Sequence, residues 1–247
     1  KKYILDLAKF EKLELDENNI EKILKELKGT IKKYSGKKAS NVESKFENMV
    51  FVQGGKYQPS FADEEKEVFD IEVCKYPTTQ KMWTEVMENN PSYFKGDNKP
   101  VEKINWWQAL DYCNKLSEKY GLEPVYDLSK SAQGILMIKE LGGEIVYPDV
   151  ANFKNTEGFR LPTEVEWEWF ARGGQIAIEQ GTFDYTYSGS NNFNEVAWYY
   201  DNSGGDNGST KDVGLKKPNQ LGLYDCSGNV WEWCYDTTEN IEEGKNY

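Results

Sequence analysis

The sequence predicts an α+β fold with little regular secondary structure, preceded by a helical N-terminal extension. Residues 1–48 are rich in Lys and Glu and contain no Trp or Pro, whereas short strand patterns and aromatic residues begin at Met49. Helix starts with capping side chains follow between residues 78 and 166. Residues 173–220 are rich in Gly, Asn and Ser, so this stretch is predicted to consist mainly of loops.

The first 48 residues are predicted to form a small helical extension that serves as a stalk or packing arm. Asp16 is placed to cap a helix that Gly29 ends. The apolar residues of this helix recur at helical spacing, as Ile20, Ile23, Leu24 and Leu27. A polar linker is expected over residues 35–44. We therefore predict an extension over 1–48 and a domain over 49–247.

The domain is predicted to open with short strands and continue with capped helices. Met49–Val52, followed by Gly54 and Gly55, predicts a strand that ends in a tight turn, and Val68–Val73 predicts a second strand. Three helix starts are expected, at Thr78 or Thr79, at Asn105 with Gln108, and at Thr163 with Glu166. In the last of these helices, the buried stripe is expected to be Trp167, Phe170 and Ala171.

Net charge excludes several classes of partner. The 247 residues include 42 Asp and Glu against 30 Lys and Arg, a formal net charge of −12. A nucleic-acid surface needs clustered basic residues, so nucleic acid is not an expected partner. The same charge disfavours anionic lipid, and no apolar run is long enough to span a membrane. An acidic chain is, however, compatible with hard cations such as calcium.

Histidine is absent, and this excludes many catalytic arrangements. Ser-His-Asp triads, Cys-His dyads and histidine-ligated zinc or iron sites all require it. The four cysteines are Cys74, Cys113, Cys226 and Cys234, with no C-x-x-C pair among them. Dispersed cysteines of this kind are expected to be buried, inert thiols, with a disulfide as the alternative.

Four ordered segments carry a family resemblance. They are residues 90–101 (NPSYFKGDNKPV) with 104–109 (INWWQA) and 112–117 (YCNKLS), residues 158–173 (GFRLPTEVEWEWFARG), residues 187–190 (YSGS), and residues 217–233 (KPNQLGLYDCSGNVWEW). In order and spacing they resemble the formylglycine-generating enzyme (sulfatase-modifying factor) superfamily, from about Met49 to Asp236. The resemblance implies a C-type-lectin-like fold of the formylglycine-generating-enzyme type.

Most residues of these segments have a structural interpretation. Arg160 stands before a capped helix whose tryptophans cannot both face water, which favours a helix of the core over a catalytic one. The same reasoning places Trp106 and Trp107 in a core stripe. Gly222 and Gly228 are expected to supply positive φ angles in turns.

The stretch from Asp225 to Glu232 is the best candidate for chemistry. Its two carboxylates bracket a turn that contains Gly228, so carboxylate and carbonyl oxygens could together hold Ca²⁺. In the enzymes that the chain resembles, the matching positions bind calcium through the side chains at Asp225 and Glu232 and the carbonyls at Gly228 and Val230. The alternative is an Asx-turn at Asp225 and an ion pair between Glu232 and an arginine such as Arg160.

A second acidic loop was weighed as a cation site. Residues 201–206 read Asp-Asn-Ser-Gly-Gly-Asp and supply two carboxylates. A plain solvated loop is the favoured interpretation there.

The resemblance does not extend to the segment that carries the enzyme's catalytic cysteine pair. The family's enzymes oxidise a target cysteine with O₂ and a copper-binding cysteine pair, which follows the Trp-Glu-Trp box near an Arg-Gly-Gly-Ser-type turn. The sequence reaches Tyr247 before such a turn, so the C-terminal end of the domain is expected to lie beyond it. Cys226 and Cys234 lie in the wrong segment to replace the pair. The related iron enzymes of the superfamily need histidine ligands.

These features favour a non-catalytic scaffold for ligand binding. The variable proteins of diversity-generating retroelements resemble this superfamily, display varied residues after the Gly-Asn-Val-Trp-Glu-Trp box, and are often exported to the cell surface. The resemblance therefore implies a binding face near Trp231–Asp236, with Trp231 as the candidate ligand contact and an exported or cell-surface location. The alternatives are a formylglycine-generating oxidoreductase with catalytic cysteines beyond residue 247, and a calcium-stabilised structural domain.

Overall fold

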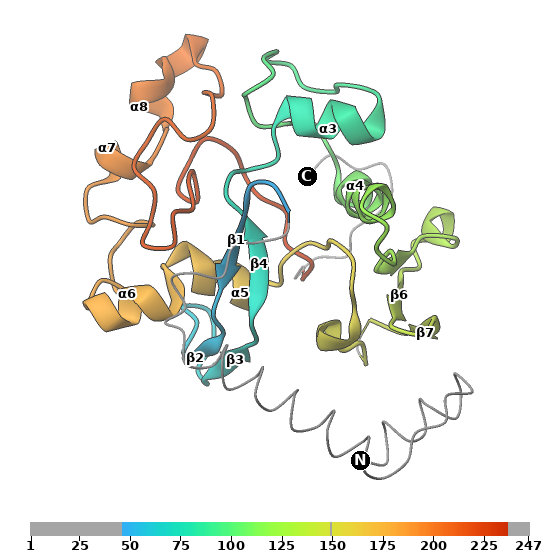
Figure 1. Cartoon of the computed structure of the whole chain (residues 1–247). Helices are drawn as coiled ribbons and strands as arrows, with labels where there is room; N and C mark the ends of the chain where they lie inside the picture. Colours follow the sequence, from blue (N-terminus) through green and yellow to red (C-terminus); the bar gives the residue numbers. More distant parts are fainter. Residues whose placement is uncertain (1–45, 149, 237–247) are drawn as a thin grey trace. The chain divides into compact units, whose positions relative to one another are not determined.

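A computed structural model describes residues 46–148 and 150–236 of the chain (Figure 1). The predicted extension over 1–48 and its linker therefore lie outside the described residues, apart from residues 46–48. The helical elements are α3 (Gln80–Met87), α4 (Trp106–Lys119), α5 (Glu164–Ala171), α6 (Gly174–Gln180), α7 (Phe193–Val196) and α8 (Tyr200–Ser203), with 3-10 turns at Ser131–Gln133, Phe153–Asn155 and Gly205–Asn207.

A bent antiparallel ribbon forms the centre of the domain. It contains β1 (Met49–Val52), paired with β4 (Ile71–Cys74), and β2 (Gly55–Tyr57), paired with β3 (Lys66–Val68). The first predicted strand is confirmed. The single strand predicted over 68–73 is wrong, because the chain breaks between β3 and β4, where the Asp70 carboxylate accepts a hydrogen bond from the Gly54 N–H (2.8 Å). A Cβ at Gly54 would lie 2.3 Å from the Val68 carbonyl oxygen, so only glycine allows this close approach.

The three predicted helix starts are confirmed, each with its capping side chain. Thr79 accepts from the Met82 N–H at the start of α3. Asn105 and Gln108 form a reciprocal capping box at α4, as Thr163 and Glu166 do at α5. Each box satisfies two of the main-chain N–H groups that a helix leaves unpaired at its first turn.

Two hydrophobic clusters make up the core. One is built on α3 and α4 and includes Trp106 and Trp107, both buried as predicted. The other is built on the ribbon and α5 and includes Trp169 and Phe170. The stripe expected on α5 is partly wrong, because Trp169 is fully buried while Trp167 is only half-buried.

A three-stranded antiparallel sheet follows α4 in the chain. It contains β5 (Tyr126–Asp127), β6 (Met137–Glu140) and β7 (Glu144–Val146), in that order. Ile138 of β6 is fully buried in the α3–α4 cluster, so the sheet covers one side of that cluster. Figure 1 shows β6 and β7 on the α4 side of the central ribbon and α6, α7 and α8 on the opposite side.

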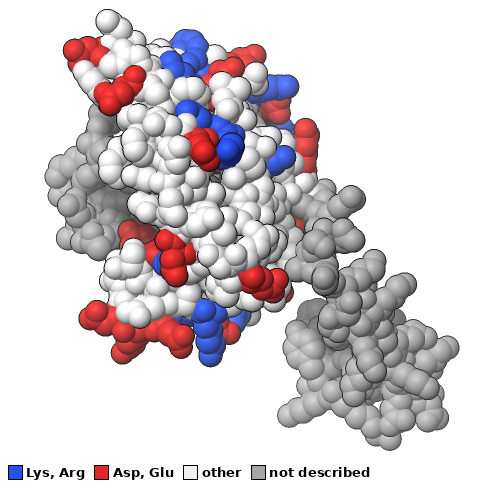
Figure 2. Space-filling model, turned by 90° about the vertical axis from the view of Figure 1, so that its left-hand side faces the viewer, with Lys and Arg blue, Asp and Glu red and all other residues white. Residues whose placement is uncertain are grey.

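The loop-rich stretch predicted over 173–220 is confirmed, with only the short helices α6, α7 and α8. Side-chain amides hold much of it together. Asn219 donates to the carbonyls of Phe170 (2.8 Å) and Ala171 (3.2 Å), and Asn202 donates to the carbonyl of Ala197 (3.0 Å). Figure 2 looks at the side of the molecule that carries these helices and shows a largely uncharged surface. The stretch is thus held by side chain to main chain bonds together with scattered main chain to main chain bonds, such as that from Val213 to Asn98, and contains no named strand.

Candidate functional site

A groove of about 560 Å³ separates the two hydrophobic clusters. Residues of both clusters line it, including Val73 and Leu223 from one and Tyr112 and Trp233 from the other. Pockets of a few hundred cubic ångströms with largely apolar walls are typical of ligand sites. The end of the described chain, including Val230–Trp233, forms part of its wall.

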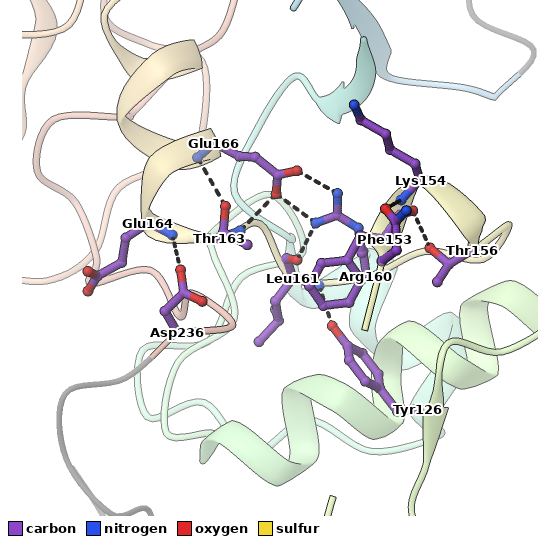
Figure 3. A network of polar contacts seen from close by, with 11 residues as sticks. Tyr126, Phe153, Lys154, Thr156, Arg160, Leu161, Thr163, Glu164, Glu166 and Asp236 are labelled. Atoms are coloured by element: carbon purple, nitrogen blue, oxygen red, sulfur yellow. Dashed lines mark hydrogen bonds and ion pairs between the residues drawn. The ribbon is translucent and has the colours of Figure 1, made fainter. Parts of the chain in front are cut away.

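A network of hydrogen bonds centred on Arg160 and Glu166 lies beside the groove at the start of α5 (Figure 3). Arg160 donates two hydrogen bonds to Glu166, at 2.7 and 2.6 Å, and a third to the Leu161 carbonyl at 3.0 Å. The guanidinium also lies over the Phe153 ring, 4.5 Å from its centroid. Burial lowers the pKa of Arg160, but the hydrogen bonds and charge of Glu166 outweigh it and keep that pKa above its usual value.

The last described residues are also hydrogen-bonded to the start of α5. The Asp236 carboxylate accepts from the Glu164 N–H at 2.8 Å (Figure 3). The Tyr235 N–H donates to the Pro162 carbonyl at 2.7 Å. The Tyr235 ring packs edge-on against Phe153, with centroids 4.8 Å apart. The segment after Trp233 is therefore anchored to α5.

The loop from Asp225 to Glu232 is strained at defined positions. Asp225 and Asn229 have φ angles of 58° and 66°, in the left-handed region that is unfavourable for residues other than glycine. Gly222 and Gly228 also have positive φ, as predicted. A Cβ at Gly228 would lie 2.2 Å from the Trp198 carbonyl oxygen, so the loop requires glycine there. Strain of this kind is often found at ligand sites.

Asp225 is a buried carboxylate that is only half satisfied. Its Oδ2 accepts from the Gly214 N–H at 2.7 Å, whereas Oδ1 has no hydrogen-bond partner among the described residues. Burial raises the pKa of Asp225, and the hydrogen bond from Gly214 and the nearby Asn229 side chain only partly offset this effect. A buried carboxylate without a neighbouring positive charge is costly to keep ionised.

Glu232 lies at the other end of the loop and lines the groove. The Trp167 indole N–H donates to its carboxylate at 2.7 Å. The Glu232 side chain is exposed at the surface, but the protein atoms around its carboxyl group reduce its solvation and raise its pKa to about 7; the Trp167 bond opposes this rise and the charge of Asp225 adds to it. The ion pair weighed between Glu232 and Arg160 is wrong, because Arg160 is committed to Glu166.

The residues of the candidate calcium site lie on one loop, where Asp225 and Glu232 have different hydrogen-bond partners, and neither carboxylate forms an ion pair with a described Lys or Arg. Among the described residues, no cluster of three or more His, Cys, Asp or Glu side chains forms a metal site. The set is two carboxylates and the carbonyls of Gly228 and Val230, and the Gly228 carbonyl also accepts from the Val230 N–H at 2.9 Å. The unpartnered Asp225 Oδ1 fits a cation with oxygen ligands.

The second acidic loop does not gather its carboxylates around a shared site. Asp206 accepts a hydrogen bond from the Tyr200 hydroxyl, so one of its two carboxylates is held by a neighbouring side chain.

Trp231 and Trp233 both line the groove, but Trp231 is exposed whereas Trp233 packs against the core. Trp231 has a relative exposure of 102%, so it does not pack into the core of the described residues. Trp233 packs against the α3–α4 cluster and donates to the Ile104 carbonyl at 3.2 Å. Trp231 is thus the exposed aromatic residue of this segment, and its role as a ligand contact stays a prediction.

The four cysteines are free thiols. Burial raises the pKa of Cys113 and of Cys234 to about 12, and it also raises the pKa of Cys74 and Cys226. Thiols of this kind stay protonated at neutral pH, whereas nucleophilic and metal-binding cysteines are thiolates. The expectation of free thiols rather than a disulfide is confirmed, whereas the expected burial holds fully only for Cys113, since the other three cysteines are half-buried.

The fold and the position of this loop define a C-type-lectin-like domain of the formylglycine-generating-enzyme type. The chain belongs to the family of sulfatase-modifying factor enzyme 1-like domains, whose model matches residues 35–247. None of the described helices has the length and apolar character needed to cross a membrane.

Several proteins are similar to the chain over much of its length. Chaperone protein LppX of Paenibacillus barcinonensis is 39% identical over 217 residues, which cover 81% of this chain and 75% of that protein. The formylglycine-generating enzyme of Mycobacterium tuberculosis is 34% identical over 57% of this chain and 45% of its own length. Variable protein 1 of Treponema denticola is similar in structure, with a TM-score of 0.57, 33% identity, and coverage of 80% of this chain and 75% of that one.

Proposed function

We propose that the chain is a non-catalytic ligand-binding scaffold of this family. The observation that carries the proposal is the groove between the two cores, whose wall ends in the fully exposed Trp231. The raised thiol pKa values disfavour a catalytic role for these four cysteines themselves.

The proposed ligand surface is the segment Trp231–Asp236, as in a retroelement-diversified variable protein. The likeness to variable protein 1 supports this assignment, and the likeness to a chaperone supports a polypeptide as the ligand. The bonds from Asp236 and Tyr235 to the start of α5 hold the segment in one conformation. A rigid display segment binds at a lower cost in conformational entropy. An exported or cell-surface location belongs to the same proposal.

Calcium is proposed as a structural ion for the loop beside this surface. The side chains of Asp225 and Glu232 and the carbonyls of Gly228 and Val230 would hold it. Bound calcium would supply the positive charge that the Asp225 carboxylate lacks and would fix the turn next to Trp231.

A selection experiment tests the scaffold. A displayed library of random twelve-residue peptides is panned against the full chain, and the selected peptides are measured against Trp231→Ala and Tyr200→Ala. Tyr200 is the matched control because it is also an exposed aromatic residue, on the far helix α8. An exposed Trp that becomes buried in an interface contributes about 2 kcal/mol or more. We expect weaker binding only for Trp231→Ala; equal binding by both variants contradicts the proposal.

The likeness to formylglycine-generating enzymes favours an oxidoreductase as the second candidate function. Incubating the full protein with Cu(I), O₂ and a Cys-x-Pro-x-Arg peptide tests it. Aldehyde formation on the peptide would replace the scaffold proposal with the enzyme.

A further inference from the structure

An aromatic row of three rings, Tyr187, Phe193 and Tyr199, lies on the side of the molecule that carries α7. The Tyr187 and Phe193 rings pack edge-on with their centroids 5.7 Å apart, and the Phe193 and Tyr199 rings do so at 4.9 Å. Phe193, in the middle of the row, is exposed, as is Tyr185 two residues before Tyr187. Exposed groups of aromatic residues commonly mark interaction sites.

Two asparagine side chains lie at the two ends of the aromatic row, and each is fixed through its amide oxygen. Asn191 Oδ1 accepts from the N–H of Thr186, the residue before Tyr187, at 2.9 Å. Asn194 Oδ1 accepts from the Tyr199 hydroxyl at 2.9 Å. The side-chain NH₂ groups of both asparagines have no hydrogen-bond partner among the described residues. The surface therefore offers two oriented N–H donors, whereas the matching oxygens already accept from the protein.

Charged side chains beside the row already have partners within the protein. Lys217 donates to the Glu195 carboxylate at 3.1 Å, and Lys216 donates to the Asn194 carbonyl at 2.7 Å. Figure 2 shows a largely uncharged surface on this side of the molecule. A partner of this surface would therefore be recognised by apolar contact and hydrogen bonds rather than by charge.

We infer that the aromatic row, together with Asn191 and Asn194, binds a proline-rich segment of a partner polypeptide in the polyproline II conformation. Such a segment presents apolar pyrrolidine rings, and its carbonyls have no internal hydrogen bonds. Proline also lacks an N–H, so the segment supplies acceptors and no main-chain donors. Aromatic rings with fixed amide donors complement both properties. The inference goes beyond the proposed function, because it concerns a surface other than Trp231–Asp236.

A neutral oligosaccharide is the other class of partner that an uncharged aromatic surface could bind. Sugar hydroxyls donate as well as accept, so a sugar also needs acceptors on the protein. The amide oxygens of Asn191 and Asn194 are occupied, and the ring planes meet at 62° and 74° instead of forming one flat platform. The surface therefore favours the acceptor-rich peptide, and the oligosaccharide becomes an outcome of the test.

Titration of the full chain with a labelled ten-residue polyproline peptide tests the inference. A ten-residue Gly–Ser peptide is the flexible control, and fluorescence anisotropy measures both affinities. We expect polyproline to bind about tenfold or more tighter, because its conformation is formed before binding. Its affinity should change by less than about twofold between about 0.05 and 0.5 M salt, because no charge pair contributes.

Matched variants locate the peptide on the row. Asn191→Asp combined with Asn194→Asp removes both free NH₂ groups but keeps the oxygens that accept from the protein, and it should weaken polyproline binding about tenfold. Asn207→Asp makes the same change at an exposed asparagine outside the row and should leave the affinity within about twofold. Phe193→Leu removes the central ring and should weaken binding about tenfold. Urea unfolding of each variant shows whether the fold is retained.

Several results contradict the inference. They are no measurable binding of polyproline, equal affinity for polyproline and the Gly–Ser peptide, and equal polyproline affinity in the Asn191 and Asn194 double variant and in Asn207→Asp. Binding of cellohexaose in place of polyproline, with a loss in Phe193→Leu, would assign the row to carbohydrate. Loss of polyproline binding in Trp231→Ala would place the peptide on the other surface. The scaffold proposal fails separately, if no library peptide depends on Trp231.

Discussion

Two acidic centres of the domain, each with a buried carboxylate at Glu166 or Asp225, differ in what completes them. At the start of α5, Glu166 is held by both nitrogens of Arg160 and by the Thr163 N–H. In the loop that follows Leu223, Asp225 has one oxygen without a partner among the described residues, and Glu232 has an indole N–H but no cation. Burial is costly for any carboxylate unless an opposite charge compensates it. The first centre is therefore finished by residues that the structure describes, whereas the second is unfinished among them, and we propose that a bound cation completes it.

The largest loss of unfolding free energy is expected at the finished centre, when the pair of Arg160 and Glu166 is broken. Arg160→Met leaves Glu166 buried without its cation, and breaking a buried pair in this way typically costs about 3–5 kcal/mol of unfolding free energy. The surface pair Lys115–Asp111, at 2.9 Å, is the control, because Lys115→Met should cost less than about 1 kcal/mol. Urea unfolding measures both. Similar losses of unfolding free energy for the two variants would show that the Arg160–Glu166 pair contributes no more than an exposed ion pair.

The second prediction concerns calcium at the unfinished centre. Calcium at about 100 times its Kd should stabilise the protein by about 2.7 kcal/mol, because it binds only the folded loop. Asp225→Asn should remove this gain, and without calcium it should be neutral or stabilising, since it removes a buried charge. Asp206→Asn, in the loop after α8, should keep the gain. An unchanged melting temperature in calcium and in chelator would contradict the site.

The difference between the centres also follows from the sequence, but only in part. The capping box Thr163–Glu166 and the position of Arg160 before it are visible as a local pattern, so the finished centre could be approached from the sequence. The sequence also placed Asp225 and Glu232 on one loop. It could not show that Arg160 turns to Glu166 rather than Glu232, because that choice depends on packing over the Phe153 ring.

The groove itself left no signal in the sequence. Val73 and Trp233 are distant in the chain, and both appear as ordinary core residues. Only the placement of two separate cores shows that a space remains between them. The break between β3 and β4 was missed for a related reason: it depends on the close approach of Gly54 to the Val68 carbonyl, a contact between non-adjacent residues.

A third prediction concerns pH in the calcium-free protein. The protein atoms around the exposed Glu232 side chain reduce the solvation of its carboxyl group and raise its pKa from an ordinary value near 4.5 to about 7. A carboxyl group with a raised pKa in the folded state stabilises the fold below the ordinary value and loses that contribution as pH rises. The unfolding free energy should therefore fall between pH 4.5 and 7, and less so in Glu232→Gln. Glu195→Gln is a control of opposite sign, because the bond to Lys217 lowers the pKa of Glu195. A free energy that rises over this range in wild type and in Glu232→Gln alike contradicts the assignment.

The smallest loss of unfolding free energy is expected at Asp236, beside the pair of Arg160 and Glu166. Asp236→Ala removes the carboxylate that accepts from the Glu164 N–H at the start of α5. Loss of a capping acceptor costs about 0.5–2 kcal/mol, and an exposed position such as this one should lie near the lower limit. Guanidinium unfolding measures the loss. A larger loss than that of Arg160→Met would reverse the ranking of the two contacts.

Calorimetric titration of the full chain with calcium tests the central distinction between the two centres most directly. One calcium ion should bind per chain, Asp225→Asn should abolish the binding, and Arg160→Lys, which keeps the charge at the finished centre, should leave it intact. Absence of calcium binding in the wild-type protein, or equal binding after Asp225→Asn, would contradict the account.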